Sequence, residues 1–140
     1  MNKIKILISL FLISFSILPV FAINWVECAN KIYIDIDNIE PSYDELGNKI
    51  NGEYSYWLKI LNDKSEPFKN SEQLLNKKIW YSLQHTNISC NTKTTSLEEF
   101  IYYDLNNNPI YSETNFLKER NAIVPGSVAD FIYQNVCIKR

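Results

Sequence analysis

The sequence is short of glycine and histidine and has no excess of basic residues. Only three of its 140 residues are glycine and one is histidine, whereas 14% are aromatic. It contains no internal repeat, low-complexity tract or long block of like charge. This composition is typical of a packed, β-rich domain rather than of a disordered chain. Because the formal net charge is −2, the sequence lacks the concentrated basic face that nucleic-acid binding requires.

The sequence has no apolar run of the length that a membrane span usually needs. The run Ile6–Val20 covers about 15 residues, whereas a transmembrane helix needs about 20. Two lysines precede this run and Ala22 follows it, which predicts a secretory signal peptide over residues 1–22 and one mature domain over residues 23–140. A retained membrane anchor is the alternative. We therefore expect an exported protein without a stable membrane span.

Alternating apolar and polar residues predict an antiparallel sheet. Within Lys31–Ile39, isoleucines alternate with a tyrosine and two aspartates, which is the pattern of a half-buried strand. Two aromatic residues followed by three asparagines predict a hairpin after Tyr103, and Gly47-Asn48 predicts a turn. Further strands are predicted over Tyr54–Leu61, Lys78–Cys90 (with a break allowed near Thr86-Asn87) and Cys90–Leu105, and a short helical turn over Ser71–Asn76.

The segment Ala122–Cys137 predicts a C-terminal helix. Gly126 permits a bend after Pro125, and the Ser127 hydroxyl is a good N-cap for the helix that follows. A helix of about ten residues is marginal in isolation, so we expect it to rest on the sheet. The predicted fold class is α+β, a small antiparallel β-sheet with a C-terminal α-helix packed on it. The helix would bury one apolar face, formed by Val128, Ala129, Ile132 and Val136.

Three cysteines occur in the sequence: Cys28, Cys90 and Cys137. In an oxidising compartment, one disulfide is expected and one cysteine is left over, but the sequence alone allows all three pairings. A bond between Cys90 and Cys137 would fix the end of the helix to the sheet. For a loop of about 47 residues, the chain-entropy model gives up to about 4 kcal/mol of stabilisation. Cys28 would then be a buried thiol or a thiol that joins two chains.

The order of the short motifs resembles the surface-adhesin protein E family of Gram-negative bacteria, and the match spans nearly the whole mature chain. The motifs are Trp25, Tyr33–Asp35, Trp57, Ser89-Cys90, Tyr103-Asp104, Pro125-Gly126-Ser127 and Val136-Cys137. The resemblance implies a small antiparallel sheet with a C-terminal helix. It also implies that the disulfide joins Cys90 to Cys137, so that the fold is stapled by this bond.

The resemblance also implies a function. It predicts a non-catalytic binding protein of the periplasm or cell surface that recognises host proteins such as vitronectin, laminin or plasminogen. The sequence departs from the family pattern because it has no lipid-anchor cysteine, carries the additional Cys28, and has Arg120-Asn121-Ala122 where a tryptophan is expected. The missing anchor favours an alternative, a soluble periplasmic accessory protein with an envelope partner. A homodimer through an exposed strand edge is compatible with both functions.

Acidic residues near the first predicted strand do not form a recognisable metal site. Asp35, Asp37, Asn38 and Glu40 lack the third ligand and the glycine of a calcium-binding loop, because Ile39 and Glu40 occupy those places. We therefore expect these side chains to lie on the solvated face of a strand.

The remaining candidate residues also favour structural roles. His85 has no metal-site spacing, and neither His85 nor Cys28 lies in a local signature of a nucleophile and its base. Asn87-Ile88-Ser89 fits a glycosylation acceptor, which a bacterial context disfavours. The sequence thus predicts no catalytic, cofactor or metal site and no enzymatic activity. Aromatic residues alternate in two of the predicted strands, and we expect them mainly to pack in the core. Those on the opposite side of each strand could form an exposed recognition face. The residues are Tyr54, Tyr56, Trp57, Trp80 and Tyr81.

Overall fold

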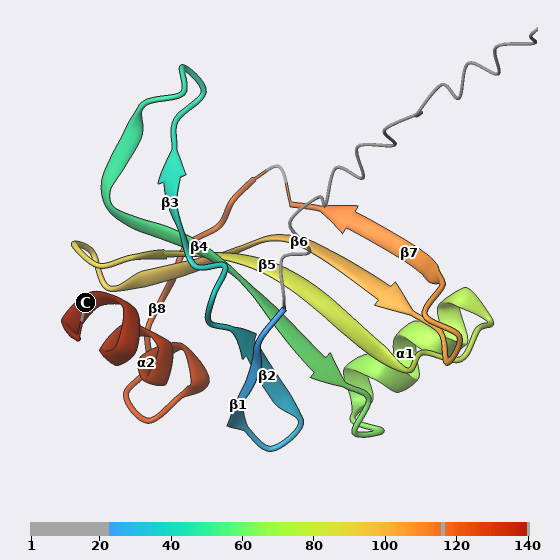
Figure 1. The fold of residues 1–140 in the computed structure, drawn as a ribbon. Coiled ribbons are helices and arrows are strands. Elements are labelled where there is room, and N and C mark those ends of the chain that lie inside the picture. Colours follow the sequence, from blue (N-terminus) through green and yellow to red (C-terminus); the bar gives the residue numbers. More distant parts are fainter. Residues whose placement is uncertain (1–22, 116, 140) are drawn as a thin grey trace, which may run out of the picture.

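The computed structural model describes residues 23–115 and 117–139, so the predicted signal peptide lies outside the described residues. The described part forms one antiparallel sheet in the order β1-β2-β4-β5-β6-β7, with β3 also paired to β4 and β8 to β6 (Figure 1). The predicted α+β class is confirmed. The strands are β1 (Trp25–Ala29), β2 (Ile32–Asp35), β3 (Glu40–Tyr43), β4 (Lys49–Leu61), β5 (Tyr81–Ser89), β6 (Thr94–Tyr103), β7 (Pro109–Thr114) and β8 (Asn121–Ala122).

Two hairpin turns are built in the same way. Asp44 Oδ1 accepts hydrogen bonds from the N–H groups two and four residues further along the chain, at 2.9 and 2.8 Å. Asp104 Oδ1 does the same at 2.8 and 2.9 Å. Each turn contains a residue with positive φ, Gly47 at 81° and Asn107 at 62°, which glycine and asparagine tolerate best. The turns join β3 to β4 and β6 to β7, and both lie where the sequence predicts them, although β3 itself is not predicted.

The C-terminal helix begins at the predicted cap. Ser127 Oγ accepts a hydrogen bond from the N–H of Asp130 at 3.2 Å. The α-helix α2 (Val128–Tyr133) follows and continues as the π-helical turn η1 (Gln134–Ile138). The cap satisfies an N–H group that has no partner inside the helix, which explains why the helix starts here.

The hydrophobic core lies between this helix and one face of the sheet. Ile132 and Val136 are 1% and 2% exposed, so the predicted apolar side of the helix is buried. They pack on side chains that alternate along β2, β4 and β5 and therefore share one face of the sheet. The sheet residues of this core are Ile34, Tyr56, Leu58 and Ile88.

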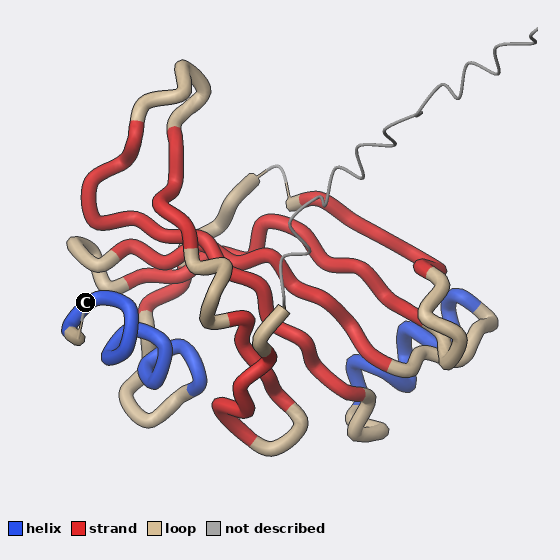
Figure 2. Tube along the Cα trace, viewed as in Figure 1, coloured by secondary structure: helices blue, strands red, loops and turns tan. Residues whose placement is uncertain are grey.

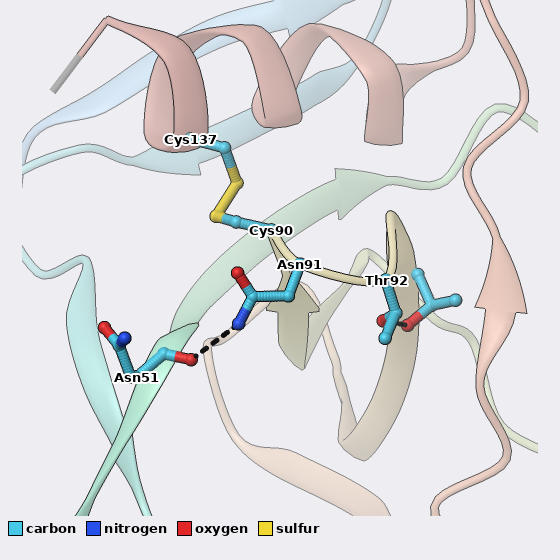
Figure 3. The surroundings of a disulfide bond; sticks show 6 residues. Asn51, Cys90, Asn91, Thr92 and Cys137 are labelled. Carbon is cyan, nitrogen blue, oxygen red and sulfur yellow. Dashed lines mark hydrogen bonds between the residues drawn. A yellow bond between two sulfur atoms is a disulfide. The ribbon is translucent and has the colours of Figure 1, made fainter.

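A disulfide joins Cys90, at the end of β5, to Cys137 in η1, as the family resemblance implies (Figure 3). The two Cα atoms are 5.5 Å apart. The neighbouring Asn91 donates a side-chain hydrogen bond to the carbonyl of Asn51 at 3.0 Å, which ties the same turn to β4. The disulfide and this hydrogen bond together connect the last helical turn to the central strands β5 and β4.

The other helix, α1 (Glu66–Leu75), connects β4 to β5 and is longer than the helical turn predicted over Ser71–Asn76. It buries Phe68, whose ring centroid lies 6.1 Å from that of Tyr102. Tyr102 is paired with Ser82 of β5 and therefore lies on the same face as Ser82. Ser82 is an even number of residues from the core residue Ile88 in the same strand, so these two also share a face. Both helices therefore pack on the same face of the sheet. Figure 2 shows the two helical segments at opposite ends of the sheet.

Several predicted elements differ from the structure. β2 ends at Asp35, which is only 4% exposed, so the prediction that Asp35 lies on a solvated face is wrong. β5 runs unbroken through Thr86-Asn87; the irregularity instead affects its pairing with β6, next to His85. The sequence does not predict strands β1, β3 and β8, which are only five, four and two residues long and too short for a clear alternating pattern.

Candidate functional site

The two faces of the sheet differ in what covers them. Among the described residues, the helices occupy one face of the sheet, and we call the other the helix-free face. Directly paired residues of antiparallel strands point to the same side, so Trp57 shares this face with His85, and Ser55 with Asn87. Across the other edge of β4, Glu40 pairs with Ser55. Aromatic, acidic and amide side chains from strands far apart in sequence therefore meet on the helix-free face.

A hollow of about 370 Å³ lies on the helix-free face, and we call it the Asp35 hollow. Two tryptophans and two carboxylates contribute to its wall, and no lysine or arginine among the described residues does so. Its size is within the range of small-molecule sites. The described residues that line it are Ile23, Trp25, Asp35, Asn38, Glu40, Ser55, Trp57, Leu83 and His85.

His85 is held between a ring and a carboxylate. Its imidazole stacks on the indole of Trp57, with ring centroids 4.7 Å apart and an angle of 28° between planes. Its Nδ1 lies 3.3 Å from Glu98 Oε2. The predicted structural histidine thus sits in the wall of the hollow, where Glu98 already balances any positive charge it carries. Cys28 packs against the core on the helix-covered face, so the two residues are not brought together as nucleophile and base.

Asp35 is the most unusual group in the hollow. Its Oδ2 accepts a hydrogen bond from Asn38 Nδ2 at 2.7 Å, but its buried Oδ1 has no hydrogen-bond partner among residues 23–115 and 117–139. No described lysine, arginine or histidine forms an ion pair with it either. A buried carboxylate without a positive partner is energetically costly, which marks this position as a candidate binding group. Asp37, two residues further on, is exposed.

A second hollow, of about 480 Å³, adjoins the first and shares Glu40, Ser55 and His85 with it. Asn87 lines its wall, donates from Nδ2 to Ser42 Oγ at 2.6 Å, and leaves its own buried Oδ1 without a partner in the described part of the chain. Thus two of the buried acceptor atoms that lack partners, one in Asp35 and one in Asn87, belong to neighbouring hollows on one face.

The glycosylation acceptor suggested by the sequence is not accessible in the folded chain. Asn87, Ile88 and Ser89 are 3%, 0% and 3% exposed. A glycan needs its acceptor asparagine at the surface, so this triplet serves β5 and its packing instead.

A third hollow, of about 420 Å³, lies next to α1 and Trp80. The carboxylate in its wall, Glu72, already accepts hydrogen bonds from the N–H of Ile79 at 2.9 Å and from Asn62 Nδ2 at 3.3 Å. The bond from Ile79 lowers the pKa of Glu72. The Glu72 carboxylate thus already has hydrogen-bond partners within the protein, so this hollow is a weaker candidate for a binding site than the Asp35 hollow.

The sequence does not predict the Asp35 hollow. The motif Tyr33–Asp35 contributes to the family resemblance, but the alternating pattern places its aspartate on a solvated face. The alternation continues through Ile36 and Asp37, whereas β2 ends at Asp35, so the pattern does not indicate that this carboxylate is buried. Among the described residues, no group of three or more histidine, cysteine or acidic side chains is arranged to hold a metal ion.

Comparison of the chain with protein-family models, with curated proteins and with solved structures found no match. Within the described part of the chain, no helix is both long enough and apolar enough to cross a membrane.

Proposed function

We propose that this protein is an exported, non-catalytic binding protein that recognises a protein partner through the helix-free face of its sheet. The observation that carries this proposal is the asymmetry of the sheet. Both described helices pack on one face, and the disulfide fastens one of them to the sheet. The helix-free face instead presents two indoles beside two carboxylates, those of Trp25, Trp57, Asp35 and Glu40. Aromatic side chains supply much of the binding energy at protein interfaces.

The disulfide supports export, because such bonds persist mainly in oxidising compartments. Two locations fit this proposal. At the cell surface, the protein would act as an adhesin for host extracellular-matrix or serum proteins, as the resemblance to the protein E family implies. In the periplasm, it would serve as an accessory protein of the envelope. Fractionation of the producing cells, combined with protease accessibility of intact cells, separates the two.

A capture experiment tests the binding function. The purified mature protein is immobilised and exposed separately to vitronectin, laminin, plasminogen and an envelope extract. Trp25→Ala changes an aromatic side chain of the helix-free face and should weaken capture. Phe131→Ala is the matched control, because this ring is 44% exposed on α2. Equal capture by both variants, or no capture by the parent at micromolar concentration, contradicts the proposal.

A further inference from the structure

The Asp35 hollow combines features that point to one class of ligand chemistry. Its wall contains a carboxylate that is 4% exposed and has no positive partner among the described residues, and a second carboxylate, Glu40, lies in the same wall. We propose that the Asp35 hollow binds a cationic group, an ammonium or guanidinium. This inference rests on the proposed function, because it states what the helix-free face would recognise.

The unpartnered atom of the Asp35 hollow matches a cation that donates hydrogen bonds. Asp35 Oδ1, which has no hydrogen-bond partner among the described residues, is an acceptor. An ammonium offers three N–H donors and a guanidinium five, and neither has an acceptor. A cation in the Asp35 hollow would offset the cost of the buried negative charge, whereas an anion would meet two carboxylates.

The aromatic walls favour the same chemistry. Trp25 and Trp57 both line the hollow; His85 covers one face of the Trp57 indole, and an uncovered indole face attracts cations more strongly than other side-chain rings do. The helix-free face already shows one such contact, since Lys59 Nζ lies 4.5 Å from the centroid of the Tyr81 ring. Trp25 pairs directly with Asp35 across β1 and β2, so indole and carboxylate are neighbours in the sheet.

Cationic groups of this size come from two sources, a free small amine or a basic side chain of a partner protein. The test therefore uses n-butylammonium chloride and an acetylated, amidated Gly-Lys-Gly peptide, with n-butanol and the norleucine analogue of the peptide as neutral controls. Binding is followed by the NMR shifts of the three tryptophan indole N–H groups. Trp25 and Trp57 should respond, and Trp80, which does not line this hollow, serves as the internal reference.

Asp35→Asn is the decisive variant, and we expect it to weaken binding of the cationic probe by about tenfold or more. The matched control is Asp37→Asn, which removes an exposed carboxylate two residues away and should change the affinity by less than about twofold. Ser55→Lys provides an independent check, because it places a tethered ammonium in the same hollow and should prevent the shifts caused by the probe. Circular dichroism verifies that each variant is folded.

Three results would overturn the inference. They are the absence of shifts with both cationic probes up to about 10 mM, equal shifts with the neutral controls, or unchanged binding by Asp35→Asn. Preference for butylammonium identifies a free amine as the ligand, and preference for the lysine peptide identifies a basic side chain; both support the inference. Failure of the proposed function is distinguishable, because the hollow can bind the probes when no protein partner is captured. Conversely, partner capture that does not depend on Asp35 supports the proposed function and removes the cation site.

Discussion

Removal of the disulfide tests how the C-terminal helix is held. The double substitution Cys90→Ser with Cys137→Ser opens a loop closed by residues 47 positions apart. For this separation, the chain-entropy model gives about −14 cal/mol/K, or about 4 kcal/mol at 25 °C. Because domains of this kind are stable by only about 5–15 kcal/mol, the loss would be a large part of the total.

The assay is urea unfolding followed by far-UV circular dichroism. We expect the double variant to lose up to about 4 kcal/mol in free energy of unfolding. Cys28→Ser is the control. Cys28 is the free cysteine of the described residues, so this substitution removes a thiol but no cross-link. Amide hydrogen exchange should also accelerate first in α2 and η1, since a helix this short is marginal without its tether. A loss below about 1 kcal/mol, or uniform acceleration of exchange, would refute the view that the bond holds the helix on the sheet.

Three further predictions concern the core and the buried titratable groups. Ile132→Ala should cost about 2–5 kcal/mol in urea unfolding, whereas Phe131→Ala, at the exposed neighbour, should cost less than about 1 kcal/mol; equal costs would place the core elsewhere. Burial raises the pKa of Tyr56 to about 12 from 10.0, so its contribution to stability is complete below pH 10 and is lost as the pH rises from 10 towards 12. Tyr56→Phe should therefore lose less stability over this interval than the parent protein, and an identical loss would contradict the burial of the hydroxyl. Burial also raises the pKa of the Cys28 thiol, so iodoacetamide at pH 8 should label it more slowly in the folded protein than in urea; equal rates would show that the thiol is freely exposed.

The sequence was most informative where a strand has one apolar and one polar side. β4 and β5 were predicted because their alternation reflects a covered and an uncovered face. The hairpin after Tyr103 and the Ser127 cap were predicted because the chemistry of each is local. β3 was missed because Pro41 and polar neighbours carry no strand pattern, although it pairs with β4. α1 was only partly predicted, since its start at Glu66 precedes the apolar residues of its second half.

The candidate site was beyond local sequence patterns for a different reason. The Asp35 hollow is formed by residues of β1, β2, β3, β4 and β5, and their proximity follows from the register of several strand pairs. Register depends on long-range packing and turn geometry, which a single strand does not reveal. The burial of Asp35 depends on the same pairing, because an aspartate at a strand end reads as exposed until its neighbours are placed.

The stability of Asp35→Asn separates a structural role for this residue from a binding role. The Asn38 amide donates to Asp35 Oδ2 at 2.7 Å, and an asparagine side-chain oxygen can accept the same hydrogen bond. The other oxygen has no partner in the described chain, so the carboxylate is buried with only one of its two oxygens hydrogen-bonded, which costs stability. We therefore expect the free energy of unfolding of Asp35→Asn to equal or exceed that of the parent in urea unfolding at neutral pH. A carboxylate kept at a cost to folding is typical of a binding site. Destabilisation of this variant, with Asp37→Asn unchanged, would instead mean that the Asp35 carboxylate stabilises the fold.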